Sequence, residues 1–111
     1  MQVKFTSREQ FLKQVKDIKE WVVLVCECIE RQLQEFDKNA TFTVSNIQNL
    51  FLFTAKIYKE SITFSLPEDQ VKQLISKGDY SFDQYLWDKI QEYGIHFQLN
   101  SPYLKTVYGL A

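Results

Sequence analysis

Four serines are each followed three residues later by Glu or Gln, and each pair precedes a segment whose apolar residues have helical spacing. In this capping-box pattern the serine hydroxyl accepts a hydrogen bond from the third helical N–H, and the Glu or Gln side chain bonds back to the serine N–H. We therefore predict an α+β fold that is predominantly helical, with about four helices and short strands between them. The pairs are Ser7/Gln10, Ser45/Gln48, Ser65/Glu68 and Ser81/Gln84.

The first helix is predicted to be long, from Ser7 to about Asp37. Its apolar residues recur at spacings of three and four, which places them in one stripe. From Trp21 to Cys26 every residue is apolar, so the centre of this helix should be buried on all sides. Two alternatives remain: a buried strand over the same apolar run, since β-branched residues dominate it, or a helix break near Lys19–Glu20. The stripe consists of Phe11, Val15, Ile18, Val22, Val25, Ile29, Leu33 and Phe36.

Three further helices and a small antiparallel sheet complete the prediction. The second helix is expected over residues 46–59 after Ser45, and the third ends before Gly78, which suits a left-handed position. The fourth is expected to run from Phe82 to Tyr93. Alternation of apolar and polar residues predicts the strands, which cover residues 2–5, 41–44 and 62–66 and a C-terminal hairpin over 95–99 and 103–108.

Composition indicates one globular domain, residues 1–111, with no strong overall charge. The chain is 45% hydrophobic and has a formal net charge of −1, so bulk charge gives no general attraction to nucleic acid or to an anionic membrane. The distribution is uneven, because residues 67–94 hold six acids and three bases, whereas residues 1–40 hold seven of each. The acidic segment is either a solvated surface or a surface that faces a basic partner.

Nothing in the sequence is typical of export, membrane insertion or metal binding. The N-terminal residues lack the apolar core of a signal peptide, and the run from Trp21 to Cys26 is far shorter than the roughly 20 residues of a membrane span. We therefore expect a cytoplasmic protein with no membrane partner. Cys26 and Cys28 would point to opposite sides of a helix, and His96 is the only histidine. Reduced thiols and no metal site are expected.

The sequence also lacks a recognisable catalytic set. A Ser-His-acid or Cys-His arrangement would need His96, which strand alternation places on a polar face. The three glycines form no phosphate-binding motif. The acids fall on solvated faces, where burial would not raise their pKa values. We expect no catalytic residues, no cofactor and no enzymatic activity.

The candidate binding residues gather on and before the fourth predicted helix. Phe82, Leu86 and Ile90 share one face, and Trp87 falls well off it. Trp87 either packs under the C-terminal hairpin or against the first helix, or lies exposed as a binding hot spot whose acidic surroundings would select a basic partner. The candidate partner-binding residues are Asp79, Tyr80, Asp83, Trp87, Asp88 and Gln91.

Three functional hypotheses follow. The leading one is a small protein that inhibits or neutralises another protein, such as a basic toxin or nuclease, in the manner of immunity proteins, antitoxins and phage-encoded inhibitors. The second is a winged-helix-like nucleic-acid-binding protein, because the element order over residues 62–108 resembles the second half of that fold. The acids on its would-be reading helix argue against nucleic acid. The third is a subunit that forms a homodimer through its first helix. The sequence does not fix the oligomeric state.

Overall fold

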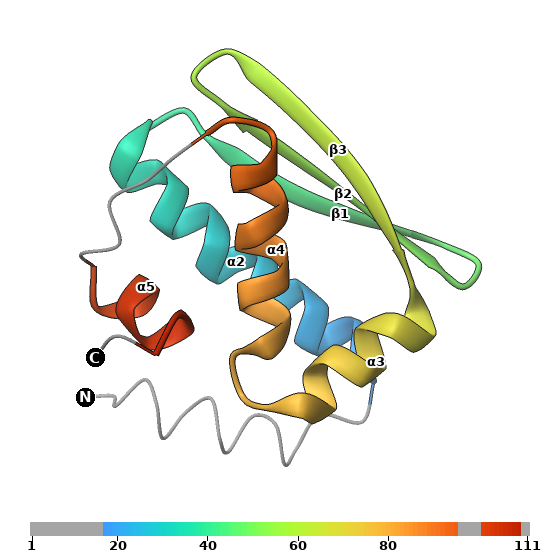
Figure 1. Cartoon of the computed structure of the whole chain (residues 1–111). Helices are drawn as coiled ribbons and strands as arrows, with labels where there is room; N and C mark the ends of the chain where they lie inside the picture. Colours follow the sequence, from blue (N-terminus) through green and yellow to red (C-terminus); the bar gives the residue numbers. More distant parts are fainter. Residues whose placement is uncertain (1–16, 96–100, 110–111) are drawn as a thin grey trace.

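The computed structural model describes residues 17–95 and 101–109, which form an α+β fold as predicted. Three strands follow one another in a small sheet, and helices precede and follow them (Figure 1). The prediction of about four helices with a small antiparallel sheet is confirmed in number, although two of the elements differ in place. In chain order the elements are α2 (Ile18–Phe36), β1 (Thr41–Ile47), β2 (Leu50–Ile57), β3 (Glu60–Pro67), α3 (Glu68–Lys77), α4 (Ser81–Glu92) and α5 (Pro102–Val107).

The sheet is antiparallel in the order β1-β2-β3, and two-residue turns connect its strands. Residues of β2 alternate between buried and exposed along the strand, which defines an inner and an outer face. Helices α2 and α4 lie on the inner side of this sheet (Figure 1). The fold is therefore two layers, with one face of the sheet turned away from the helices.

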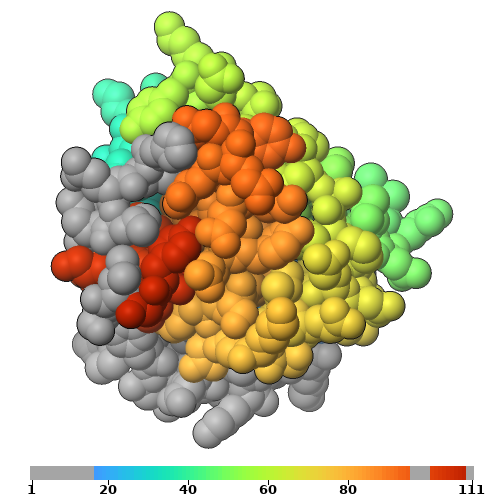
Figure 2. Space-filling model, in the orientation of Figure 1, coloured from blue at the N-terminus to red at the C-terminus, as the bar shows by residue number. Residues whose placement is uncertain are grey.

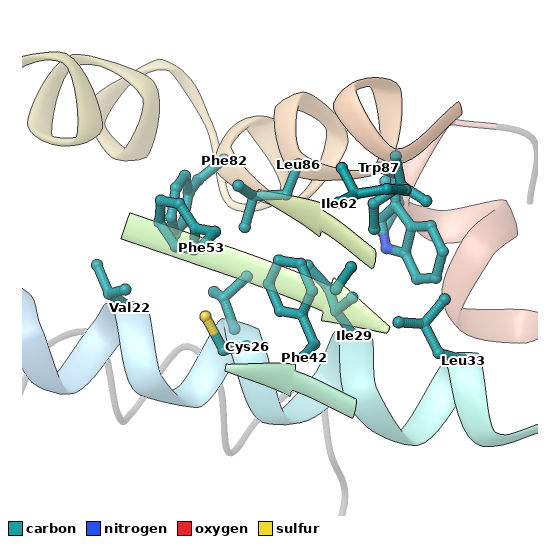
Figure 3. Close-up of a cluster of buried hydrophobic side chains, with 14 of the residues drawn as sticks. Val22, Cys26, Ile29, Leu33, Phe42, Phe53, Ile62, Phe82, Leu86 and Trp87 are labelled. Carbon is teal, nitrogen blue, oxygen red and sulfur yellow. The ribbon is translucent and has the colours of Figure 1, made fainter. Parts of the chain in front are cut away.

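The core fills the space between the sheet and these two helices (Figure 3). Phe53, at the centre of β2, is fully buried, and its ring lies 5.4 Å from that of Phe64 and 6.1 Å from that of Phe82, measured between centroids. From α2, the apolar stripe of Val22, Val25, Ile29 and Leu33 is fully buried. This part of the stripe packs inside the chain's own core, so it is not available for a dimer through the first helix.

Helix α2 begins at Ile18, which corrects the prediction of one continuous helix from Ser7. Asp17 has extended φ and ψ of −124° and 124°, and its side chain accepts a hydrogen bond from the Lys19 N–H. Such an aspartate is an N-cap, so the chain cannot continue as a helix through it. The run from Trp21 to Cys26 is helical, and the alternative break near Lys19–Glu20 was close to the true boundary. The predictions for residues 2–5 and Ser7/Gln10 fall outside the described residues.

The predicted second helix, residues 46–59, is wrong: this segment forms the end of β1, a turn, and β2. Ser45 lies within β1, and Gln48 is in the turn with a left-handed φ of 55°. Alternate residues of β2 are buried, namely Phe51, Phe53, Ala55 and Ile57. A period of two and a wealth of aromatic and β-branched residues favour a strand over the helix that the capping pattern suggested.

The third and fourth predicted helices are confirmed as α3 and α4, but their predicted caps are not. Ser65 lies in β3, and Pro67, the actual N-cap of α3, provides no side-chain bond. Tyr80 is the N-cap of α4 and again provides no side-chain bond. Gly78 has a φ of 169°, which is extended backbone and not the left-handed conformation. The strands predicted at 41–44 and 62–66 lie within β1 and β3.

The C-terminal hairpin prediction is wrong over residues 103–108, because Pro102–Val107 is helix α5. Ser101 caps this helix by accepting a hydrogen bond from the Leu104 N–H at 3.1 Å, and Pro102 suits its first turn. The helix removes the wing on which the winged-helix hypothesis depended. The strand predicted at 95–99 lies almost entirely outside the described residues. Within those residues no helix combines the length and apolarity needed to cross a membrane.

Candidate functional site

The six predicted binding residues divide into two groups by exposure. Asp83 and Trp87 have no exposed surface, so of the two possibilities for Trp87 the exposed binding hot spot is wrong. The alternative, a packed tryptophan, is confirmed, with α5 in the place expected for the hairpin. Asp79 and Asp88 are exposed, and Tyr80 and Gln91 are half-buried. A partner could therefore reach only the second group in this conformation.

Tyr103 of α5 explains why α4 buries both a carboxylate and an indole. Its hydroxyl donates to Asp83 Oδ2 at 2.6 Å and accepts from Trp87 Nε1 at 3.3 Å. The tyrosine side chain is only half-buried, but its hydroxyl lies against two fully buried groups. Burial, followed by the negative charge of Asp83, raises the Tyr103 pKa well above its usual value. The hydroxyl therefore remains a hydrogen-bond donor over the whole physiological pH range.

Tyr108, which follows α5, repeats this arrangement closer to solvent. Its hydroxyl donates to Asp88 Oδ1 at 2.8 Å and accepts from Gln91 Nε2 at 3.3 Å. Burial and the hydrogen bond to Asp88 raise the pKa of Tyr108. Asp83, Trp87, Asp88 and Gln91 thus anchor the chain's own C-terminal helix. Sequence analysis predicted these residues to bind a partner and did not predict their contacts with Tyr103 and Tyr108.

A second connection ties α5 to α2. The Ser101 hydroxyl donates to Gln32 Oε1 at 2.7 Å, while its oxygen also caps α5. Gln32 is buried although it is polar, and this bond helps to satisfy it. Helix α5 is therefore an integral part of the fold, held by α4 on one side and by α2 on the other.

The outer sheet face, defined here as the side chains of the sheet that point away from the helices, was not predicted. It contains twelve residues, none buried, and Lys56 is the only charged one. Hydroxyl side chains dominate its centre, where Thr54 and Thr63 lie 3.4 Å apart through their Oγ1 atoms. The residues are Thr41, Thr43, Ser45, Ile47, Leu50, Leu52, Thr54, Lys56, Ser61, Thr63, Ser65 and Pro67.

Apolar side chains gather at one end of the outer sheet face. Ile47 and Leu50 are direct cross-strand partners and expose 59% and 39% of their surface. Pro67 is the partner of Leu50 on the other side, and Leu52 is the next outward residue of β2. Four apolar residues are thus neighbours, and all of them except the half-buried Leu52 are exposed. The alternation of residues 50–57 was the sequence signal that could have revealed this face.

The opposite end of the sheet has a strained turn beside an open hollow of about 530 Å³. Tyr58 and Lys59 both have left-handed φ values, 54° and 67°, which residues other than glycine rarely adopt. The turn is held by Asp37, whose Oδ2 accepts from the Tyr58 N–H at 2.9 Å. Hydrogen bonds from the backbone N–H groups of Tyr58 and Asn39 lower the pKa of Asp37.

Comparison of the chain with protein-family models, with curated proteins and with solved structures gave no match. Any functional assignment must therefore come from the chain's own surfaces. Three surfaces are available in the described residues: the outer sheet face, the exposed acids around α4, and the hollow at the Tyr58–Lys59 turn. The first differs most from an ordinary solvated surface, because it is extended and almost uncharged.

Proposed function

We propose that this chain is a small binding protein that attaches to another protein through the outer sheet face. The observation that carries the proposal is the exposure of Ile47 and Leu50 side by side on a face with one charge among twelve residues. Single exposed apolar residues are common on protein surfaces, but contiguous exposed apolar patches mark interaction sites.

The composition of the face supports a protein partner. Charged residues are depleted at the centre of protein interfaces, and polar groups gather at the rim. The outer sheet face follows this pattern, with uncharged side chains at its centre, Lys56 toward one end and Lys59 in the adjoining turn. Its outward residues follow one another at about 6.8 Å, so four rows extend roughly 20 Å. A standard interface buries about 800 Å² on each partner, so the adjoining turns would also take part.

The functional class remains that of immunity proteins, antitoxins and phage-encoded inhibitors, which act by occupying a surface of their target. The cytoplasm remains the compartment that we propose. Support comes from Cys26 and Cys28, which are both present as thiols, because disulfides predominate in oxidising compartments. Burial raises the pKa of the Cys26 thiol, which keeps it protonated and chemically inert.

The proposal can be tested by affinity capture from a lysate of the native source with wild-type and variant chains. The test variant is Ile47→Glu with Leu50→Glu, which places two charges in the apolar patch. The control is Val23→Glu on α2, because Val23 is 46% exposed and lies on a different surface. A partner that wild type and the control capture, and the double variant does not, would support the proposal. Equal capture by all three chains would refute it.

A second candidate is neutralisation of a basic protein through the exposed acids of α3, α4 and the turn between them. Asp69, Asp79, Asp88 and Glu92 are all exposed, and charge complementarity of this kind accelerates association. The test is the association rate of a captured partner with Asp79→Asn plus Glu92→Gln, compared with Glu20→Gln plus Glu27→Gln on α2. A slower, less salt-sensitive association for the first pair alone would support this candidate, and equal rates would exclude it.

A further inference from the structure

The two edges of the sheet differ in how well they are protected. At the β1 edge, the carboxylate of Glu30 on α2 accepts a hydrogen bond from the Phe42 N–H at 3.1 Å. This side chain occupies a backbone donor that a foreign strand would need. Natural proteins protect sheet edges with such charged groups because an open edge is a template for pairing with another chain. The β1 edge is therefore partly closed.

The β3 edge has no comparable protection among the described residues. Ile57 and Glu60 flank a two-residue turn and therefore bond to each other, and the Glu68 N–H donates to the Asn49 C=O. Every second residue of β3, counted from Glu60, thus directs its backbone hydrogen bonds to β2. The intervening residues direct their N–H and C=O groups away from the sheet. These residues are Ser61, Thr63 and Ser65, and within the described part of the chain no turn, loop or side-chain hydrogen bond reaches their backbone groups.

The sequence of this edge is self-complementary. If a second copy pairs with it antiparallel about Thr63, Thr63 faces Thr63 of the second copy, Ser61 faces Ser65, and Ile62 faces Phe64. Thr–Thr pairs and aromatic–β-branched pairs are both favourable across antiparallel strands. No residue from Ser61 to Leu66 is charged and none is proline, so nothing in this segment opposes pairing. The half-buried Phe64 would gain cover from Ile62 of the second copy.

Helix α4 supplies a second surface beside the same edge. Figure 2 shows α4 and β3 next to each other on one side of the molecule, with α5 on the other side of α4. At about 100° per residue, the side of α4 opposite its α5 contacts carries four partly or fully exposed residues. We name this surface the α4 flank: Tyr85, Lys89, Glu92 and Tyr93.

On the α4 flank the positive charge of Lys89 is balanced by the negative charge of Glu92, whereas the other charged residues of the helix are acids. Lys89 Nζ lies 3.6 Å from Glu92 Oε1 and 5.5 Å from the centre of the Tyr85 ring. Two such flanks brought together by a two-fold axis would place a base and an acid from each copy in reach of each other. Tyr93, which is 57% exposed, would add aromatic contact area.

From these observations we infer that the chain forms a two-fold symmetric dimer through its β3 edge and α4 flank. The sheets of the two copies join into one six-stranded sheet, and the two α4 helices lie next to each other beneath it. A closed dimer of this kind covers the open edge that a monomer exposes. The outer sheet faces remain uncovered, so the dimer would present two copies of the surface assigned above to a partner, and the inference does not depend on that assignment.

The test is sedimentation equilibrium of the full chain and of lysine variants on opposite edges of the sheet. Thr63→Lys places two like charges directly opposite each other at the two-fold axis. Thr43→Lys is the matched control, because Thr43 lies on the same face and in the same row but on β1. Wild type and Thr43→Lys should be dimeric with similar dissociation constants, and Thr63→Lys should raise the constant about tenfold or more. A monomeric wild type, or an unchanged constant in Thr63→Lys, would overturn the inference.

A mixing experiment tests the register. Thr63→Glu should also be a weakened dimer by itself, whereas an equimolar mixture with Thr63→Lys should form a heterodimer, because each lysine then faces a glutamate. Circular dichroism of each variant shows whether it is folded, and Thr63 is exposed in the monomer, so both substitutions should be tolerated. Failure of the mixture to associate more tightly than either variant would exclude pairing about Thr63.

Discussion

The hydroxyl of Tyr103 should contribute more to stability than any other single hydroxyl of the C-terminal helix. Replacement of Tyr103 by Phe removes one oxygen and leaves the ring in place. Asp83 then loses a 2.6 Å hydrogen bond, and the Trp87 indole N–H loses its acceptor at 3.3 Å. Both groups are fully buried, so water cannot replace the lost oxygen without entering the core.

The expected magnitude follows from these two bonds. A hydrogen bond to a charged group contributes about 1.5–3 kcal/mol, and a bond between neutral groups about 1 kcal/mol. Tyr103→Phe should therefore lower the free energy of unfolding by about 3 kcal/mol. For a chain of 111 residues this corresponds to a fall in Tm of about 13 °C.

Tyr108→Phe is the matched control, because Tyr108 also donates to an aspartate of α4. Its acceptor, Asp88, is exposed, so water can replace the hydroxyl and the expected loss is about 0.5 kcal/mol. Urea unfolding monitored by circular dichroism would compare the two variants. If Tyr103→Phe is no more destabilising than Tyr108→Phe, the burial of Asp83 and Trp87 is not what gives Tyr103 its effect.

Two other predictions concern the strained turn and alkaline pH. Lys59→Gly should raise the free energy of unfolding by about 0.5–1 kcal/mol, because glycine adopts the observed φ of 67° without strain. Lys72→Gly in α3 should lower it by about 1 kcal/mol, and a loss in both variants would contradict the turn geometry. Because folding raises the pKa values of Tyr103 and Tyr108 above the usual 10.0, folding favours their protonated forms. Stability should hold below about pH 10 and fall above it. Urea midpoints measured on both sides of pH 10 should fall less in the double variant Tyr103→Phe with Tyr108→Phe than in wild type. An equal fall would refute the assignment of the pH dependence to these two hydroxyls.

The elements that sequence analysis predicted correctly are those defined by local pattern. The spacing of apolar residues in α3 and α4 and the apolar stripe of α2 each indicate a helix without reference to the rest of the chain. The segment 46–59 was different, because Ser45 and Gln48 match a capping box by chance and the Phe- and Leu-rich segment suits either structure. What decides it is pairing of β2 with β1 and β3 on both sides, which a local motif does not report.

In the candidate site, too, local pattern predicted some features, and contacts between distant residues determined the others. Trp87 was predicted to fall off the apolar face of α4, whereas it is fully buried with Leu86 and Ile90. Its indole N–H bonds to Tyr103, sixteen residues later, a contact that local spacing does not report. Helix α5 itself depends on Ser101 and Pro102, which lie between the two strands of the predicted hairpin. The outer sheet face could not be predicted once β2 was taken for a helix, because its twelve residues share a face only in the observed register.

The central claim, protein binding through the outer sheet face, is tested most directly by residue-level mapping of the complex. The captured partner, once purified, would be added to ¹⁵N-labelled chain, and amide chemical shifts would be followed by NMR. Our account predicts shifts concentrated in β1, β2 and the turn between them, around Ile47 and Leu50. Shifts confined to Asp79, Tyr80, Asp88 and Gln91 on the α4 side, with the sheet unaffected, would contradict it.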